Sequence, residues 1–321
     1  MDVLVTGASG FVGSLLAPRL QEDGMRVRAF ARSPQRARAV LATGMDPAAL
    51  AEVEIHAGDA LTGAGLSEAL AGVQVAYYLI HSMERTPGPV EAFVVRERVA
   101  AENFAAAAAA AGVERIVYLG GLLPASLPGD EEALSRHLRS RGEVERILLG
   151  SSPGSVALRA SIVIGARSRS FRLMVRLVER MPVLALPAWR RSRTQPIDQR
   201  DLIEMLLACA RRPLAVRTLD VAGPDVLSYG EMLARIAELM LVGRPALGLG
   251  VNLTPITARV AAAIASEDPD LVLPLMEGLQ TDLLPADDNA AKLLGVRLHT
   301  FDAAVEHALS EWERTEVLAA R

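Results

Sequence analysis

The chain has 321 residues, 51% hydrophobic and 22% charged, with a formal net charge of −4 at pH 7. Its single cysteine, Cys209, excludes a disulfide framework and a cysteine-rich zinc or iron–sulfur site. The acidic balance argues against a nucleic-acid binder that works through a strongly basic surface. The single lysine, Lys292, leaves no lysine for catalysis earlier in the chain.

No run of about 18 uninterrupted apolar residues is present, so we expect no membrane-spanning helix. The chain begins Met1-Asp2-Val3 and enters a predicted strand at once, so we expect no signal peptide. No histidine, cysteine or carboxylate spacing typical of a metal site occurs, and we expect no structural metal. Together these features favour a cytoplasmic protein.

Strand and helix patterns alternate through the first half of the chain. The predicted strands are residues 3–5, 26–31, 52–56, 73–80, 116–119 and 156–164, and the predicted helices are residues 13–22, 35–42, 66–70, 90–111 and 131–149. This order predicts a mostly parallel sheet with helices on both faces. Right-handed crossovers then give a doubly wound, Rossmann-type α/β fold.

The pattern is looser after residue 165. Helices are predicted at residues 171–180, 201–211, 229–241 and 301–318, an extended stretch at 181–189 and a strand at 217–222. We therefore expect residues 1–165 to form the Rossmann domain, with its sheet completed by elements within 195–225. Residues 166–321 are expected to form a smaller C-terminal subdomain on the substrate side.

Three glycines follow the first predicted strand, in the sequence Thr6-Gly7-Ala8-Ser9-Gly10-Phe11-Val12-Gly13. Gly7 can take a tight turn, Gly10 lets the backbone approach a pyrophosphate, and Gly13 allows close helix–strand contact. The helix that begins here offers free N–H groups to an anion. A tight turn without a ligand is the alternative interpretation, but the strand, the helix and their order favour nucleotide binding.

This loop resembles the cofactor loop of the short-chain dehydrogenase/reductase superfamily, in its extended and atypical branches. The similarity covers essentially the whole chain, and the stretch from Tyr77 to Met83 is similar to an atypical subgroup of NAD(P)H-binding proteins related to nitrogen-metabolite regulators. The other matching segments are Gly58-Asp59, residues 158–165, Gln195-Pro196-Ile197 with Asp201, and Ala222-Gly223-Pro224. The resemblance implies a dinucleotide on residues 1–165 and a C-terminal part that closes over its nicotinamide end.

The end of the second predicted strand bears on the choice of dinucleotide. NAD-binding proteins place an acid about 20 residues past the loop, on the ribose hydroxyls. Here Arg32 and Ser33 stand near that place and no acid is present. Because a guanidinium can donate two hydrogen bonds to a phosphate, with Arg36 assisting, we predict NADP(H). A solvated arginine at a strand end is the alternative.

Asp59 has two possible roles: the resemblance implies contact with the adenine amino group, and a turn aspartate is the alternative. The full cofactor-binding set that the loop, the strand ends and the resemblance imply is Gly7, Ser9, Gly10, Phe11, Val12, Gly13, Arg32, Ser33, Asp59, Ala60, Leu79, Ile80, His81 and Gly120.

The superfamily's usual Ser, Tyr and Lys are missing. Gly120-Gly121 stands where the serine is expected, and residues 137–141 resemble a Tyr-x-x-Ser-Lys segment with His137 for tyrosine and Arg141 for lysine. In one interpretation His137 is the general acid and Arg141 holds the nicotinamide ribose. In the other, the helix has a solvated polar face with i,i+4 pairs. His81, with Ser82, is a rival proton donor.

The favoured function is an NADP(H)-dependent oxidoreductase acting on a small apolar carbonyl, enone or quinone-like substrate. The missing catalytic residues favour an alternative, a non-catalytic redox sensor, regulator or accessory subunit, and an epimerase or lyase is a weaker third. Phe171, Met174, Met181 and Trp189 either line an apolar pocket or belong to a core. The arginines within 167–193 form a solvated face or meet an anion. A homodimer or a protein partner stays open.

Overall fold

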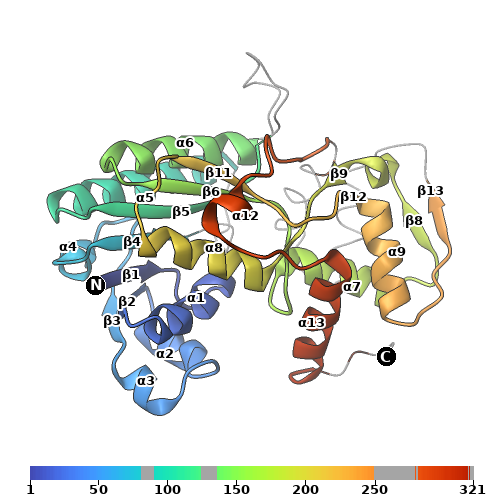
Figure 1. Cartoon of the computed structure of the whole chain (residues 1–321), viewed down its shortest axis with the longest axis horizontal. Helices are drawn as coiled ribbons and strands as arrows, with labels where there is room; N and C mark the ends of the chain where they lie inside the picture. The colour runs from blue at the N-terminus through green and yellow to red at the C-terminus, as the bar shows by residue number, and fades with distance from the viewer. Residues whose placement is uncertain (81–89, 124–135, 249–278, 280, 317, 319–321) are drawn as a thin grey trace. The chain divides into compact units, whose positions relative to one another are not determined.

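A computed structural model describes residues 1–80, 90–123, 136–248, 279, 281–316 and 318 (Figure 1). The elements of the first half are β1 (Asp2–Thr6), α1 (Phe11–Glu22), β2 (Arg26–Ala31), α2 (Pro34–Leu41), α3 (Pro47–Ala51), β3 (Glu54–Ala57), α4 (Leu66–Leu70), β4 (Val75–Tyr78), α5 (Val90–Ala110), β5 (Arg115–Gly121), α6 (Arg136–Ser151) and β6 (Val156–Ala160).

The second half has shorter strands and fewer long helices. Its elements are β7 (Val163–Ile164), α7 (Arg169–Arg180), β8 (Leu184–Leu186), the 3₁₀ helix η2 (Ala188–Arg191), β9 (Arg193–Thr194), β10 (Ile197–Asp198), α8 (Gln199–Arg211), β11 (Thr218–Val221), β12 (Leu227–Ser228), α9 (Tyr229–Leu239), β13 (Ala246–Gly248), α12 (Ala290–Leu294) and α13 (Phe301–Glu313).

The central sheet has seven strands in the order β11-β6-β5-β4-β1-β2-β3. β1 pairs with both β2 and β4, β2 with β3 and β4 with β5, and each of these pairs is parallel. The strand order reverses beside β1, which makes the gap between β1 and β4 the topological switch point where such sheets bind ligands. The predicted Rossmann-type, doubly wound parallel sheet is confirmed.

Two adjacent tyrosines show how helices cover both faces of this sheet. Successive side chains of a strand point to opposite faces. The Tyr77 hydroxyl donates to the Leu206 carbonyl of α8, at 3.0 Å, on one face. The Tyr78 ring packs edge-on against Phe104 of α5 on the other. Helices α1 and α8 therefore lie on one side of the sheet, and α5 and α6 on the other (Figure 1).

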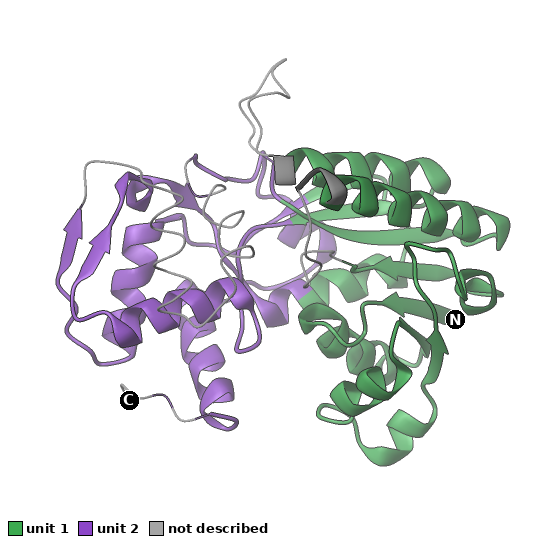
Figure 2. Ribbon diagram, turned by 180° about the vertical axis from the view of Figure 1, so that it is seen from behind, with its two compact units in different colours: residues 1–121, 136–159, 203–219 green, residues 122–135, 160–202, 220–321 purple. Residues whose placement is uncertain are grey.

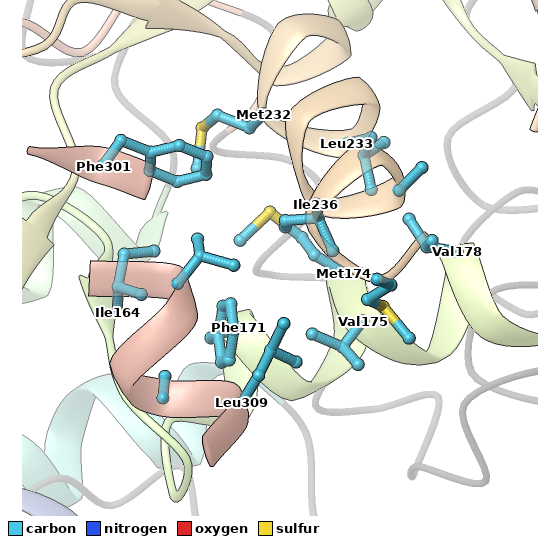
Figure 3. Close-up of a cluster of buried hydrophobic side chains, with 14 of the residues drawn as sticks. Ile164, Phe171, Met174, Val175, Val178, Met232, Leu233, Ile236, Phe301 and Leu309 are labelled. Atoms are coloured by element: carbon cyan, nitrogen blue, oxygen red, sulfur yellow. The ribbon is translucent and has the colours of Figure 1, made fainter. Parts of the chain in front are cut away.

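The chain divides into two compact units (Figure 2). Unit 1 comprises residues 1–121, 136–159 and 203–219, and it carries most of the sheet. Unit 2 comprises residues 122–135, 160–202 and 220–321, and its core is formed where α7, α9 and α13 pack together (Figure 3). Phe171, Ile236 and Leu309 are fully buried there, each burial contributing about 1.5–3 kcal/mol.

The structure corrects two local predictions. Residues 156–164 do not form one strand, because the chain breaks at Ser161 into β6 and β7, and β7 pairs with β10. At the break, the Ser161 N–H donates to the Val221 carbonyl with an N···O distance of 3.4 Å. The Ser161 and Thr194 hydroxyls form a hydrogen bond at 2.7 Å. The short helix α3 was not predicted; the Asp46 side chain caps it. Most of the loosely patterned segment 244–300 lies outside the described residues.

Candidate functional site

Thr6, the last residue of β1, fixes the start of the glycine loop. Its side chain is fully buried, and Oγ1 donates to the Tyr77 carbonyl at 2.9 Å while accepting from the Leu79 N–H at 3.0 Å. One hydroxyl thus joins the ends of β1 and β4 at the switch point. The loop that follows has a rigid support.

Each of the three glycines in the loop is required by a close approach. Gly7 has φ of +64°, and a Cβ there would stand 2.9 Å from the Leu79 carbonyl oxygen. A Cβ on Gly13 would stand 2.4 Å from the Gly7 carbonyl oxygen. The Gly10 N–H donates to that same oxygen at 2.8 Å, which closes the turn. The local geometry therefore has the close packing that the glycine spacing predicts.

The beginning of α1 fits an anion. The first N–H groups of a helix have no acceptor within the helix. Gly10 is the N-cap residue and offers no side-chain cap, and the first turn contains no acidic residue. Among the described residues no side chain caps the N–H groups of Phe11, Val12 and Gly13, and a pyrophosphate is the ligand that this kind of loop and helix start accommodates.

The turn after β2 presents free positive charge. Arg32 directly follows β2 and is exposed, and it has no hydrogen bond or ion pair with any residue that the structure describes. Ser33 caps α2, its Oγ accepting from the Arg36 N–H at 3.3 Å. Ser33 therefore has a structural role, while the Arg32 guanidinium is available to an anionic group.

Asp59 follows β3 and stabilises its own turn. Its Oδ1 accepts from the Leu61 N–H at 2.9 Å, and its backbone N–H donates to the Ala64 carbonyl at 3.0 Å. The Asn103 side chain of α5 secures the same turn by donating to the Ala60 carbonyl, at 3.0 Å. The turn role of Asp59 is thus visible, and its Oδ2 has no hydrogen bond within the described part of the chain.

The predicted cofactor residues follow five neighbouring parallel strands. The glycine loop follows β1, Arg32 follows β2, and Asp59 follows β3; Leu79 and Ile80 follow β4, and Gly120 ends β5. Because parallel strands end at a common edge, these residues lie along one carboxyl edge of the sheet. His81 lies outside the described residues.

The structure places the two catalytic candidates on α6 differently. His137 is in the first turn, and its side chain is outside the description. Arg141 is buried, as are Ser140 and Glu145, while Arg139 and Arg146 are exposed. A wholly solvated polar face is therefore the wrong interpretation of this helix, because one side of it carries buried charges toward the sheet.

Arg141 belongs to a polar group that sequence reasoning missed. Burial raises the pKa of the Tyr118 phenol of β5 to about 12, while the nearby positive charge of Arg141 opposes that rise. Glu97 of α5 is buried on the same side, and its Oε2 accepts from the Ser140 hydroxyl at 3.5 Å. Only the spatial meeting of β5, α5 and α6 reveals this group, since these residues are far apart in sequence.

The apolar substrate-side candidates of unit 2 belong to its core. Phe171, Met174 and Trp189 belong to one buried hydrophobic cluster, part of which Figure 3 shows. Met181 packs against that cluster. The arginines of the same region are partly neutralised. Arg172 and Arg176 stack on the Trp312 ring, 4.0 and 4.9 Å from its centroid, and both pair with Glu316. Arg193 pairs with Asp282 at 2.8 Å.

The described residues show neither a candidate metal site nor a candidate membrane span. No group of three or more histidine, cysteine, aspartate or glutamate side chains in that part of the chain could hold a metal ion. Among the helices whose placement is described, none is both long enough and apolar enough to cross a membrane.

Comparison with known proteins supports the dinucleotide site. Residues 7–153 match a protein family described as NAD(P)H-binding. A ceramide reductase of Caulobacter vibrioides is 27% identical over 239 residues, which is 74% of this chain and 70% of that protein.

Solved structures share the fold over nearly the whole chain. UDP-glucuronic acid 4-epimerase from Bacillus cereus in complex with NAD has a TM-score of 0.72 at 14% identity, covering 98% of this chain and 97% of its own. TunA, an NAD-dependent NDP-hexosamine 5,6-dehydratase of tunicamycin biosynthesis, has a TM-score of 0.69 at 17% identity, covering 99% of both chains.

Residues 7–153 thus match an NAD(P)H-binding domain, and the glycine loop of that domain lies at the carboxyl edge of a Rossmann-type sheet. The resemblance seen in the sequence is borne out at the level of an NAD(P)H-binding domain within a Rossmann-type fold.

Proposed function

We propose that this protein is an NADP(H)-dependent oxidoreductase that reduces the carbonyl, enone or quinone-like group of an apolar substrate. The observation that carries the cofactor preference is Arg32, which is exposed and unpaired among the described residues and follows β2 directly. A planar guanidinium in that place suits the 2′-phosphate that distinguishes NADP from NAD. No acid stands there to favour the ribose hydroxyls of NAD.

The other roles follow from the strand ends. The N–H groups after Gly10 hold the pyrophosphate, and the reduced nicotinamide, when bound, supplies a hydride. Arg141 holds the nicotinamide ribose in place of the missing lysine, and His137 and His81 are the proton donors that the sequence offers. The relative named as a ceramide reductase supports an apolar, lipid-like substrate.

Calorimetric titration with NADPH, NADP+, NADH and NAD+ tests this proposal. We expect NADPH to bind more tightly than NADH, and Arg32→Ala to weaken NADPH by about 10- to 100-fold, since a hydrogen bond to a charged group contributes about 1.5–3 kcal/mol. NADH binding should change little. Arg38→Ala, which removes another exposed arginine from α2, is the matched control. Equal losses of NADPH and NADH affinity in Arg32→Ala refute the phosphate assignment.

A non-catalytic redox sensor is the second candidate, and Gly120-Gly121 is the observation that favours it. These residues end β5 without the serine hydroxyl of the superfamily, and no lysine precedes Lys292. A marked preference for NADP+ over NADPH, with no NADPH oxidation in a screen of carbonyl compounds and quinones, supports the sensor. Turnover with any of these compounds supports the oxidoreductase.

A further inference from the structure

The Tyr118 ring fills the space that a side chain at Gly120 would need, and its hydroxyl lies beside that position. Both residues belong to β5, and because they are two apart their side-chain positions share one face of the sheet. A Cβ built on Gly120 would stand 3.3 Å from the Tyr118 Oη and 2.9 Å from Cε1 of its ring. The tyrosine thus brings a hydroxyl to the region where the superfamily has its serine.

This hydroxyl is buried without a hydrogen-bond partner of good geometry in the described part of the chain. The whole residue is 1% exposed. An unsatisfied buried donor costs about 1–3 kcal/mol, and such groups in native proteins call for an explanation. A ligand oxygen that accepts from the Tyr118 Oη removes this cost. The position at the carboxyl end of β5 is where a doubly wound sheet takes its ligand.

Charged groups around Tyr118 suit a phenol that gives up a proton. Arg141 of α6 lies near the hydroxyl, and its positive charge lowers the pKa of Tyr118. Glu97 of α5 acts in the opposite direction and helps to keep the hydroxyl protonated. The phenol is therefore in its acid form near neutral pH, and a phenolate formed there has a positive charge next to it.

We propose that Tyr118 is the proton donor of this site, with Arg141 as the residue that stabilises its phenolate. The inference rests on the proposed reductase function. As a hydride adds to the carbonyl carbon of the substrate, the π pair moves to the carbonyl oxygen, and that oxygen takes the proton from the Tyr118 Oη. The carbonyl is reduced to an alcohol, the nicotinamide is oxidised, and the phenolate recovers a proton from water.

Fluorine NMR tests this placement without any substrate. The chain has four tyrosines, so protein labelled with 3-fluorotyrosine gives four resonances, which single Tyr→Phe variants assign. We expect NADP+ to lower the pKa read from the Tyr118 resonance by about one unit or more, because a nicotinamide cation lies near it. Tyr77, on the other sheet face, should not respond. A Tyr118 resonance with the same titration in free and NADP+-saturated protein overturns the proposal.

Turnover of NADPH with 9,10-phenanthrenequinone as the probe tests the proton transfer. General acid catalysis contributes about 10²- to 10⁴-fold, so kcat of Tyr118→Phe should fall by about 100-fold or more, with the dissociation constant of NADPH within about twofold of wild type. Tyr78→Phe is the matched control. It removes a buried hydroxyl from the residue paired with Tyr118 across the strands, and its kcat should stay within about threefold.

The remaining outcomes separate this inference from the proposed function. Unchanged kcat in Tyr118→Phe, or an equal fall in Tyr78→Phe, overturns the assignment while leaving the reductase in place. A fall in kcat that occurs only in His137→Ala or His81→Ala, and not in Tyr118→Phe, also overturns the assignment of Tyr118 as the proton donor. Calorimetry that finds no NADPH binding to wild type refutes the proposed function itself, and the inference falls with it. The thermal midpoint of cofactor-free Tyr118→Phe should not drop, because the lost hydroxyl had no well-formed hydrogen bond.

Discussion

Gly13→Ala tests the packing of the glycine loop. An alanine Cβ at this position stands 2.4 Å from the Gly7 carbonyl oxygen and 2.9 Å from the Ala8 Cα, both backbone atoms that no rotamer change can move. Ordinary contact begins at 3.4 Å, so α1 or the Gly7 peptide must shift by about 1 Å. Alanine gains about 1 kcal/mol over glycine in a helix, whereas overpacking costs about 1–3 kcal/mol.

Because the clash is with backbone, we expect the larger cost to win, with a net loss of about 1–2 kcal/mol in the free energy of unfolding. Urea unfolding measures it, and calorimetry should show at least a tenfold weaker NADPH affinity because the displaced turn no longer fits the pyrophosphate. Gly150→Ala is the control: its Cβ meets nothing within 4 Å, and α6 should be slightly stabilised. Unchanged stability and affinity in Gly13→Ala refute the reasoning.

Three further predictions concern stability and reactivity. Ser228→Ala removes the capping box with Glu231 at the start of α9 and should lower the free energy of unfolding by about 1 kcal/mol, measured by urea denaturation. Cys209 is buried, and burial raises the pKa of its thiol to about 12, so Ellman's reagent should react with it only after unfolding; fast labelling of native protein contradicts this. Arg211 holds the pKa of the Asp23 carboxyl below its usual range, so the stabilisation is present above that range and is lost as pH falls through the lowered pKa. Asp23→Asn should therefore cost about 0.5 kcal/mol at pH 7 and nothing at strongly acidic pH, and an effect independent of pH would contradict the pairing.

The sequence predicts the sheet well because its strands are short apolar runs bounded by glycine or polar residues. The helix at residues 66–70 was predicted with its observed bounds, and the long alanine-rich helix ends one residue earlier than predicted, at Ala110. The glycine spacing also predicts the turn that the structure forms, since positive φ and close backbone approach are properties of glycine itself.

Other features depend on contacts that no local pattern records. The break at Ser161 has no glycine or proline to mark it and is fixed by Thr194 and Val221, which lie more than thirty residues away. The burial of Arg141 and its place beside Tyr118 follow from how α6 packs on β5. In sequence, Arg141 is one of several arginines on a charged helix, and Tyr118 is one aromatic residue in an apolar strand.

The turn after β2 is closed by a hydrogen bond between residues that are close in sequence. Ser33 caps α2 from within the turn, and the described hydrogen bonds of residues 32–36 reach neither the glycine loop nor β4. The glycine loop is supported separately, by the Thr6 hydroxyl that joins β1 to β4. Under the proposed function, the residues that select the coenzyme and the residues that bind its pyrophosphate therefore have independent structural supports. We expect that exchanging residues 32–36 changes the preferred coenzyme while the glycine loop keeps its native geometry.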